Sequence, residues 1–195
     1  MVTDRRAARH EATKLRILAA AWELAAEQGL AGISLRDLAA RVDLRQPSLY
    51  SYFDSKLALY DAMFAQAYEQ LLAAVEPLEL TGSPEEQIRQ MAYVFTRLAV
   101  ADVPRAQLLF QRTLPGFEPS PESYALANRF LDRTRRHLAA AGFTRPEDLD
   151  LYTALMGGLV NQQMANDPGG TRWLDLVDEA IDMYLEHSVP KGGTL

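Results

Sequence analysis

Cysteine is absent from this chain of 195 residues. Disulfides, cysteine nucleophiles, iron–sulfur clusters and zinc sites built from thiolates are therefore excluded. The sequence also has no apolar run near the roughly 18 residues that span a membrane. Residues 1–10 are basic and polar and have no apolar segment behind them, unlike a secretory signal. We expect a protein that works in the reducing cytoplasm and has no membrane partner.

Strand signals are missing as well, because no run of β-branched and aromatic residues alternates with polar ones between turn residues. Helix formers dominate instead, and apolar residues recur every three to four positions. No repeat of 20–50 residues marks a solenoid. The sequence predicts an all-α protein with helices over about 12–28, 34–42, 46–53, 55–77, 84–102, 104–113, 122–141, 146–166 and 171–187.

Signatures of catalysis are scarce too. The three histidines, His10, His137 and His187, do not occur in the spacings that build di-iron or zinc sites. Phosphate-binding loops, dinucleotide-binding glycines and the nucleophile elbow are not found. Adjacent carboxylates such as Glu85 and Glu86 point in different directions from a helix. We expect no enzyme, no catalytic residue, no metal and no cofactor.

The charge is unevenly distributed along the chain. Residues 1–56 hold nine Lys and Arg against seven Asp and Glu, whereas the remaining residues hold eleven against nineteen. The net charge of −6 thus combines a basic first quarter with an acidic remainder. Such a split suggests separate partners for the two parts, so the acidic average does not exclude nucleic acid as a partner of the first part.

Three short helices are expected in the basic part. Gly29 is placed to end the first as a left-handed cap. Ser34 and Asp37 open the second as a variant of the capping box, and Pro47 lies in the first turn of the third. The break of about four residues between the second and third helices is typical of a helix-turn-helix. Any small helical protein can have such spacing, so it leaves the function open.

The residues within these helices are more specific. They read Ile17-Leu18-x-Ala20-Ala21-x-x-Leu24, Gly29, Ser34-Leu35-Arg36-Asp37-Leu38-Ala39, Leu44 and Ser48-Leu49-Tyr50-x-Tyr52-Phe53-x-Ser55-Lys56-x-x-Leu59. Over residues 14–63 this series closely resembles the DNA-binding domain of TetR-family transcriptional regulators. The resemblance implies a three-helix DNA-binding domain over residues 1–55, followed by a six-helix effector-binding and dimerisation domain over residues 56–195.

Two positions depart from the family pattern. Asp43 stands where the family usually has Gly, in the turn before the third helix, and Asp tolerates a left-handed backbone better than most residues. Arg45 stands where the family favours Ser or Thr as the N-cap, and its side chain cannot accept the backbone N–H bonds. We expect the turn to survive and the start of the third helix to lack a side-chain cap.

The second helix of a helix-turn-helix lies in the major groove, and its first residues meet base edges. Arg can pair with guanine and Gln with adenine, while Pro offers apolar contact to a thymine methyl. We expect base contacts from Arg45, Gln46, Pro47 and Ser48. Nearby hydroxyl and cationic side chains suit phosphates, which position the protein without specifying sequence. These are Ser34, Arg36, Tyr50, Ser51, Tyr52 and Lys56.

Purely structural roles stay open for several residues of this region. Leu49 and Phe53 are expected in the core, and Tyr50 or Tyr52 could be partly core with an exposed hydroxyl. Arg36 could pair with the neighbouring Asp. The arginines within residues 5–9 could form a flexible arm along the DNA backbone or minor groove, or a solvated tail.

The resemblance also implies sites in the larger acidic part. It implies a dimer interface built from the last two helices, for which the apolar stripes offer Tyr152, Leu155, Leu159, Trp173, Val177, Ile181 and Tyr184. It implies an apolar pocket with a few orienting polar groups, for which the candidates are Met91, Phe95, Phe110, Phe117, Tyr124, Phe130, His137, Met156 and Gln163. The same residues could instead fill the protomer's own core.

Taken together, the resemblance implies a homodimeric, sequence-specific DNA-binding transcriptional regulator. It implies a repressor that a small apolar or amphipathic ligand releases from a palindromic double-stranded operator. The alternative is a helical adaptor that uses its helix-turn-helix for protein contacts and has no sequence-specific DNA binding.

Overall fold

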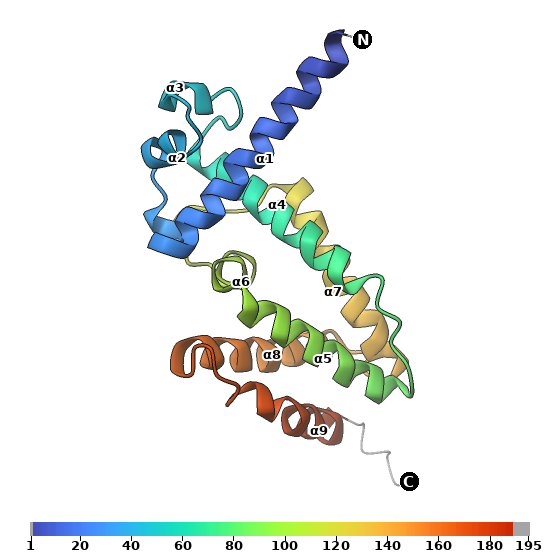
Figure 1. Cartoon of the computed structure of the whole chain (residues 1–195). Helices are drawn as coiled ribbons and strands as arrows, with labels where there is room; N and C mark the ends of the chain where they lie inside the picture. The colour runs from blue at the N-terminus through green and yellow to red at the C-terminus, as the bar shows by residue number, and fades with distance from the viewer. Residues whose placement is uncertain (1, 189–195) are drawn as a thin grey trace, which may run out of the picture. The chain divides into compact units, whose positions relative to one another are not determined.

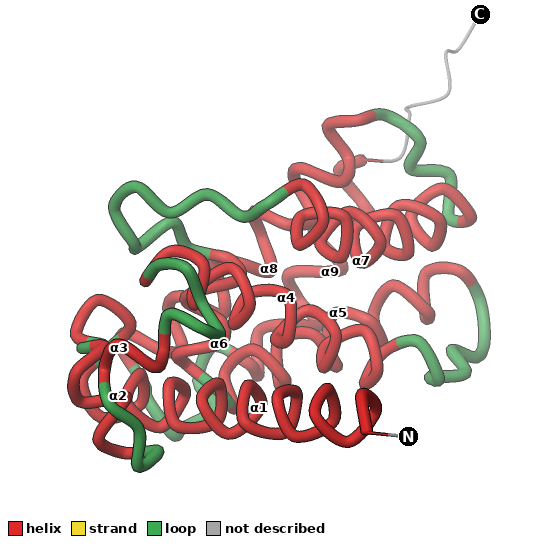
Figure 2. Tube along the Cα trace, turned by 90° about the horizontal axis from the view of Figure 1, so that it is seen from above, coloured by secondary structure: helices red, strands yellow, loops and turns green. Residues whose placement is uncertain are grey.

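The computed structural model describes the backbone of residues 2–188 and the side chains of residues 5–186. This part of the chain consists of helices joined by loops and contains no strand (Figures 1 and 2). None of its helices combines the length and apolarity needed to cross a membrane. The helices are α1 (Val2–Gln28), η1 (Leu30–Gly32), α2 (Leu35–Arg41), α3 (Gln46–Leu49), α4 (Lys56–Val75), α5 (Pro84–Ala101), α6 (Val103–Phe110), α7 (Pro121–Ala140), α8 (Pro146–Asn166), η2 (Leu174–Leu176) and α9 (Val177–Ser188).

The predicted all-α fold is confirmed, with three N-terminal helices and six later ones in the described part of the chain. Three boundaries differ most from the predictions. Helix α1 begins at Val2 instead of about residue 12, because the Ala- and Arg-rich start has good helix propensity but no apolar stripe to reveal it. Helix α3 ends at Leu49 instead of about residue 53, and the last segment starts as the 3-10 helix η2 before α9 begins.

The chain forms two compact units. Among the described residues, the first unit contains 2–69 and 104–126, and the second contains 70–103 and 127–188. Helices α4 and α7 each contribute residues to both units. The domain boundary predicted between residues 55 and 56 separates two expected functions and does not coincide with the limits of the compact units. It stays a prediction.

In the first unit, α1 packs against η1 and α2, and α2 packs against α3. Ile17, Leu38 and Leu59 from three helices are almost completely buried. Full burial of each such side chain contributes about 1.5–3 kcal/mol. Gly29 follows α1 with φ +75° and ψ 161°, so the positive φ expected at this glycine is present, but the conformation is not the left-handed helical one of the predicted cap.

Polar contacts join further helices to this unit. The indole N–H of Trp22 on α1 donates to Oε1 of Gln66 on α4 at 2.8 Å. The guanidinium of Arg105 on α6 lies over the Trp22 ring, 4.6 Å from its centroid. This stacking is a cation–π contact at the inner face of α1. Trp22 therefore links α1 to both α4 and α6.

The start of α7 is held by a carboxylate from α4. Asp61 accepts hydrogen bonds from the Ser120 backbone N–H at 2.7 Å, and from the hydroxyls of Ser120 and Ser123, each at 2.9 Å. A negative charge at a helix N-terminus is favourable because it lies close to the positive end of the helix dipole. Asp61 thus fixes the first turn of α7 within the first unit.

The second unit has its own apolar core, in which α5 packs against α8 and α9. Most of the residues predicted for the dimer interface lie in this core: Tyr152, Leu159, Val177, Ile181 and Tyr184 are buried in it, and Leu155 and Trp173 pack against it. Val177 and Ile181 are 0% exposed within the single chain, which leaves them no surface for a partner. These stripes thus pack mainly within the core of their own chain, and a dimer contact by the partly exposed Leu155 and Trp173 stays a prediction. Two amphipathic helices of one chain bury each other's apolar faces first, as the alternative reading allowed.

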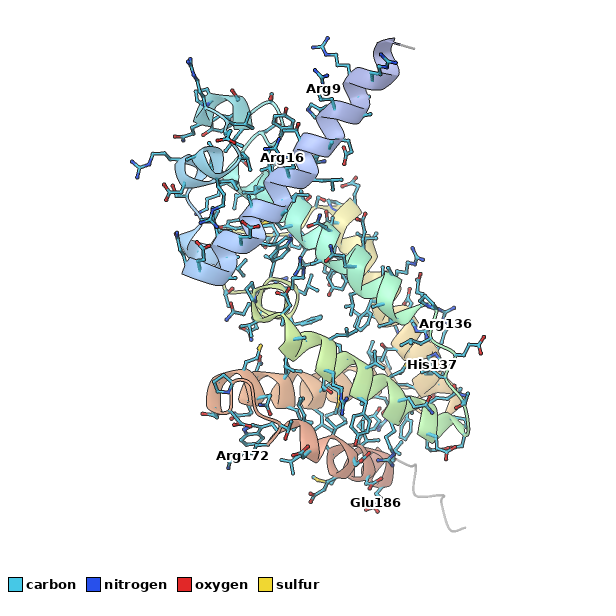
Figure 3. The ribbon with its side chains drawn as sticks, in the orientation of Figure 1. Arg9, Arg16, Arg136, His137, Arg172 and Glu186 are labelled. Carbon is cyan, nitrogen blue, oxygen red and sulfur yellow. The ribbon has the colours of Figure 1, made fainter. Side chains whose placement is uncertain are left out.

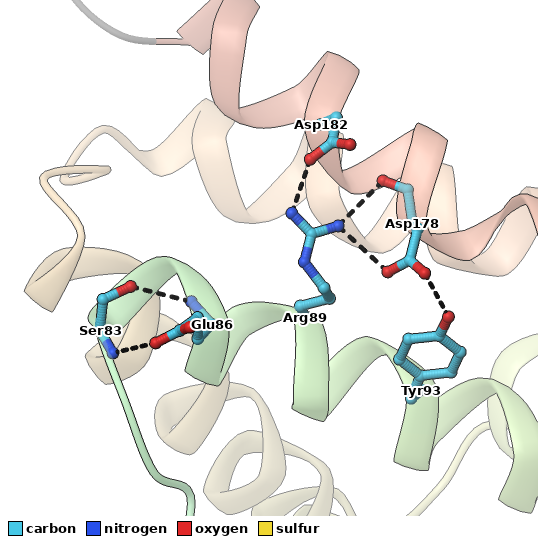
Figure 4. A network of polar contacts seen from close by, with 6 residues as sticks. All are labelled: Ser83, Glu86, Arg89, Tyr93, Asp178 and Asp182. Carbon is cyan, nitrogen blue, oxygen red and sulfur yellow. Dashed lines mark hydrogen bonds and ion pairs between the residues drawn. The ribbon is translucent and has the colours of Figure 1, made fainter.

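A polar network on the rim of this core attaches α9 to α5 (Figure 4). Arg89 donates to the Asp178 carboxylate at 3.1 Å and to Asp182 at 2.6 Å, and the Tyr93 hydroxyl donates to Asp178 at 2.5 Å. The hydrogen bond from Tyr93, followed by Arg89, lowers the pKa of Asp178. The network sets the register of α9 along α5, since each charged group has a partner on the other helix.

Helix α5 itself begins with a complete capping box. The Ser83 hydroxyl accepts from the Glu86 backbone N–H at 3.3 Å, and the Glu86 carboxylate accepts from the Ser83 N–H at 2.7 Å (Figure 4). Pro84 occupies the first turn, where its missing N–H costs nothing. These local signals fix the helix start that the sequence predicts.

Candidate nucleic-acid interface

A left-handed turn joins α2 to α3. Asp43 has φ +57°, and it is the one non-glycine residue with positive φ in the described part of the chain. Backbone bonds from Asp43 N to Ala40 O (3.3 Å) and from Leu44 N to Ala39 O (2.9 Å) close the end of α2. Asp tolerates this conformation through its short polar side chain. The expectation that the turn survives the Gly-to-Asp departure is confirmed.

Helix α3 starts on backbone geometry alone. Arg45 is in an extended conformation at the N-cap and gives no side-chain cap bond, as expected. Pro47 stands in the first turn, where its fixed φ suits a helix. After Leu49 the chain leaves the α-helix and continues in turns, with Tyr52 N and Phe53 N both donating to Leu49 O at 2.9 Å. The segment 46–53 is therefore one turn of helix followed by a tight turn.

Two apolar anchors orient this segment. Leu49 and Phe53 are buried, which confirms their predicted core role. Gln46, Ser48 and Tyr50 are exposed on the other side, with Tyr50 48% exposed. Anchors on one side and polar side chains on the other give a short rod with a solvent-facing row of donors and acceptors.

The four residues predicted to meet bases lie next to each other and are all exposed: Arg45, Gln46, Pro47 and Ser48. This order offers a guanidinium fork, an amide, an apolar ring and a hydroxyl. Guanidinium and amide groups can each make two hydrogen bonds to a purine edge in the major groove. The chemistry suits direct reading of base pairs; the base contacts themselves stay a prediction.

Ser34 and Arg36 lie at the start of α2. The Ser34 hydroxyl accepts from Asp37 N at 3.4 Å as the N-cap, while Arg36 forms an ion pair with Asp37 at 3.5 Å. The Arg36 side chain is 83% exposed, so this pair is weak and leaves the guanidinium able to exchange partners. In the structure Arg36 therefore pairs with the neighbouring Asp37, and its charged group stays on the surface.

Lys56 begins α4 close to the loop that follows α1. Its ammonium donates to Ala31 O at 3.3 Å and lies 5.5 Å from the centroid of the Tyr60 ring. The Tyr60 hydroxyl donates to Leu30 O at 2.6 Å, and burial raises the Tyr60 pKa to about 12. These contacts hold a cation at the N-terminus of α4, where the helix dipole adds to its positive potential.

Tyr52 reveals a neighbour that sequence reasoning missed. Its ring stacks on His10 of α1 at 4.5 Å with an angle of 22° between the planes, and His10 Nε2 lies 3.2 Å from Ser51 O. Tyr52 is half-buried, as the alternative for this residue allowed. His10 could not be assigned from the sequence, because the predicted helix began after it.

Of the residues predicted for ligand binding, three belong to the first unit. Phe110 and Phe117 join an aromatic cluster there: Phe117 lies 6.2 Å from Phe64, and Phe110 lies 6.3 Å from Tyr68. Tyr124 is 47% exposed. The aromatic pairs have the edge-on geometry of packed rings, although Phe110 itself is 38% exposed.

The second unit holds the other six. Phe95 and Phe130 face each other at 6.1 Å, and Met91 and Met156 lie on α5 and α8. His137 is half-buried, and its Nδ1 lies 3.2 Å from Oε1 of Gln87 (Figure 3 labels His137). Burial, followed by the positive charges of two neighbouring arginines on α7, lowers the pKa of His137. A neutral imidazole can serve as a hydrogen-bonding group in an apolar site.

Gln163 has a structural task instead. Its Oε1 accepts from Trp173 N at 2.8 Å, and its Nε2 donates to the Asp167 backbone oxygen. The side chain is 2% exposed, and both ends of its amide are used to hold the loop between α8 and η2. In this structure Gln163 therefore serves the loop, and its ligand-binding role stays a prediction. From the sequence alone, Gln163 looks like a pocket residue. A buried amide gives the same sequence pattern whether a ligand or the chain itself forms its hydrogen bonds.

Among the side chains that the structure describes, no three His, Asp or Glu residues gather as a metal site would require. The exposed segment around α3 stays the candidate DNA-contacting surface of the described chain.

Comparison with known proteins gives a consistent result. Residues 17–63 match the family described as bacterial regulatory proteins, tetR family. The search of curated proteins gives no match. Among solved structures, the TetR-family regulator PfmR from Thermus thermophilus is 25% identical, with a TM-score of 0.63 over 88% of this chain and 97% of that chain.

Two further structures carry ligands. FadR from Bacillus subtilis, solved with stearoyl-CoA, is 15% identical, with a TM-score of 0.70. AibR, solved with isovaleryl coenzyme A and operator DNA, is 18% identical, with a TM-score of 0.65. Each similarity covers 88% of this chain and 97% of the other. At these identities the likeness establishes a shared fold.

Proposed function

We propose that this chain, which belongs through its N-terminal domain to the tetR family of DNA-binding bacterial transcription regulators, is a homodimeric repressor. We propose that a small amphipathic ligand releases it from a palindromic operator. The observation that carries the proposal is the exposed row Arg45–Ser48, held outward by buried Leu49 and Phe53. We propose that this row reads base edges, with Ser34, Arg36 and Lys56 on flanking phosphates.

The short length of the recognition segment makes a second copy necessary for tight binding. One segment such as 45–52 can cover only a few base pairs. Two copies related by a two-fold axis, with their recognition segments about 34–36 Å apart, would meet successive major grooves and read a palindrome. We therefore propose a homodimer as the DNA-binding species.

The dimer surface must be formed by residues that the protomer leaves exposed. On α8 and α9 these include Leu151 (50% exposed) and Met183 (63% exposed), with Leu176 in η2 (38% exposed). A Cβ added at Gly158, two helical turns after Leu151, would meet no atom within 4 Å, so the backbone there is open to close approach. We propose this outer face in place of the buried stripes.

For the effector we propose an acyl-CoA thioester, bound by the second unit. The support is chemical and comparative: Phe95 and Phe130 form an apolar pair, and His137, whose pKa is lowered by burial, lies on the same helix as Phe130. Two structures of the same fold hold acyl-CoA ligands. An effector shifts the equilibrium only as far as it prefers one state, and a change from 1:99 to 99:1 needs a preference of about 5.5 kcal/mol.

The test is a titration of the purified protein against the DNA upstream of its own gene and against unrelated DNA, at two salt concentrations. A repressor dimer binds the first tightly, with an affinity that falls steeply with salt. Adding stearoyl-CoA or isovaleryl-CoA releases it, while free coenzyme A does not. Weak binding that is equal for both DNAs would favour the helical adaptor and overturn the proposal.

We also propose that the protein works in the cytoplasm, where the DNA is.

A further inference from the structure

The N-terminal extension of α1 is a helix and carries exposed positive charge. Arg5, Arg6 and Arg9 are exposed, and no carboxylate whose side chain the structure describes forms an ion pair with them. Elsewhere arginines do find acidic partners, as Arg41 does with Glu27 at 2.8 Å. In a chain of net charge −6, this extension carries three exposed arginines among its described side chains.

Helical spacing places these cations on a defined side of α1. Residues 5, 9 and 16 follow at intervals of four and seven, which aligns them along one stripe of a helix. Arg16 marks where the stripe faces, because its guanidinium donates to Val42 O, next to the left-handed turn, at 3.4 Å. Figure 3 labels Arg9 and Arg16 along this helix. The stripe thus runs on the side of α1 where the α2–α3 turn lies.

Contacts to the segment after α3 fix the extension in place. His10 stacks on Tyr52, and since a carbonyl only accepts, His10 Nε2 donates to Ser51 O at 3.2 Å. One turn further on, the Lys14 ammonium lies 5.9 Å from the centroid of the Phe53 ring. Three consecutive residues that follow the recognition helix are therefore held against α1, so the extension and α3 keep one relative position.

We propose that the extension Arg5–His10 is a second DNA-contact element, in which Arg5 and Arg9 bind phosphates beside the half-site and His10 is the positioning residue that sets the extension against α3. The proposal rests on the proposed function as a DNA-binding protein. It replaces the flexible arm expected from the sequence with a rigid one. Cations fixed on a helix lose little conformational freedom on binding, which makes each contact more effective.

The first experiment compares salt dependence for the wild type and the double variant Arg5→Gln/Arg9→Gln. Each lost phosphate contact lowers the slope of log affinity against log salt by about 0.9, so four lost contacts per dimer lower it by about 3.6. Affinity should fall equally for the operator and for unrelated DNA, because phosphates carry no sequence. The matched control Arg112→Gln/Arg136→Gln removes two exposed arginines of other helices and loops and should keep the slope.

The second experiment tests His10 with two variants. His10→Ala removes the stack and should abolish protection of the base pairs flanking the half-site in a footprint. His10→Phe keeps the stacked ring and should restore this protection. Thermal unfolding of each variant checks that the fold is kept; a footprint unchanged in a folded His10→Ala protein would overturn the positioning role.

The outcomes separate this inference from the proposed function. If the wild type does not prefer its operator, the proposed function fails and the extension has nothing to contact. If the wild type binds its operator and the Arg5→Gln/Arg9→Gln variant keeps the same slope, or the control loses as much, the extension proposal is wrong while the proposed function stands.

Discussion

The recognition segment and the C-terminal helix pair are both amphipathic, but they use their polar and apolar faces in opposite ways. Segment 45–53 buries two anchors and turns its polar side chains to solvent, whereas α8 and α9 bury their apolar stripes against α5 and each other. The first surface is polar and offers hydrogen bonds. The second leaves a few isolated apolar side chains outside. The first surface can contact a partner through its own polar groups. The role of the second surface depends on which molecule packs against its exposed apolar side chains.

The largest effect is expected from a charge placed in the core of the C-terminal pair. Ile181→Asp buries an unpaired carboxylate at a position that is 0% exposed, and should lower the free energy of unfolding by more than about 4 kcal/mol. Glu186→Gln, on the same helix at an exposed position, should change it by less than about 0.5 kcal/mol. Chemical denaturation measures both. Equal effects would mean that the assigned inner and outer faces of α9 are wrong.

The outer face of the pair is tested by its assembly. Leu151→Glu/Met183→Glu should convert a dimer to a monomer, because two like charges per protomer would meet across the two-fold axis. Light scattering after size exclusion reports the mass. Leu98→Glu, an exposed leucine of α5 at 39%, serves as the control and should stay dimeric. A double variant that remains a dimer would place the interface elsewhere.

On the recognition segment, Gln46→Ala should cost about 1–3 kcal/mol of operator binding and relax the preference at one base pair. The reason is the loss of a paired amide contact to one base edge. Binding to a set of operators altered one position at a time measures it, with Gln28→Ala at the exposed end of α1 as the control. A uniform loss on all sequences would assign Gln46 to the backbone.

Lys56→Ala should weaken binding to every sequence alike and lower the salt slope by about 1.8 per dimer, since two phosphate contacts are lost. Lys56→Arg keeps the charge and should keep most of the slope. Because Lys56 also contacts Ala31 O and the Tyr60 ring, a thermal melt of the Ala variant checks the domain itself. Loss on the operator alone would contradict the phosphate role.

The smallest effect concerns the rim of the C-terminal core. Tyr93→Phe removes the hydroxyl that lowers the Asp178 pKa, and should cost under about 1 kcal/mol at neutral pH because the Asp178 side chain is 50% exposed. A carboxyl with a depressed pKa stabilises the fold above its unfolded pKa of about 3.9, and this stability is lost as pH falls through the lower folded value. The loss of stability below about pH 4 should therefore be shallower in Tyr93→Phe than in the wild type. Identical pH profiles would contradict the network.

The two regions also differ in how far the sequence predicts them. Around α3, each local rule concerns one residue: Asp43 accepts the left-handed turn, Pro47 starts the helix, and Leu49 points inward. These rules hold whatever surrounds them, so the geometry follows from the sequence. The length of α3 does not, because the turn after Leu49 depends on tertiary contacts such as the stack of Tyr52.

In the second unit the limit is different. A stripe such as Val177 and Ile181 shows that one face of a helix is buried, but not whether its own chain or a partner covers it. The same holds for Gln163, whose amide is satisfied by the following loop. The start of α1 was missed for a third reason, since helix propensity without an apolar stripe gives no periodic signal.

The composition of the first unit has a consequence for building hybrid regulators. Trp22 and Asp61 are satisfied by Arg105 and Ser120, which come from a separate segment later in the chain. A graft of the N-terminal residues alone onto another sensor would separate these pairs and leave a carboxylate and an indole face against foreign neighbours. A working chimaera should therefore exchange residues 104–126 along with residues 2–69.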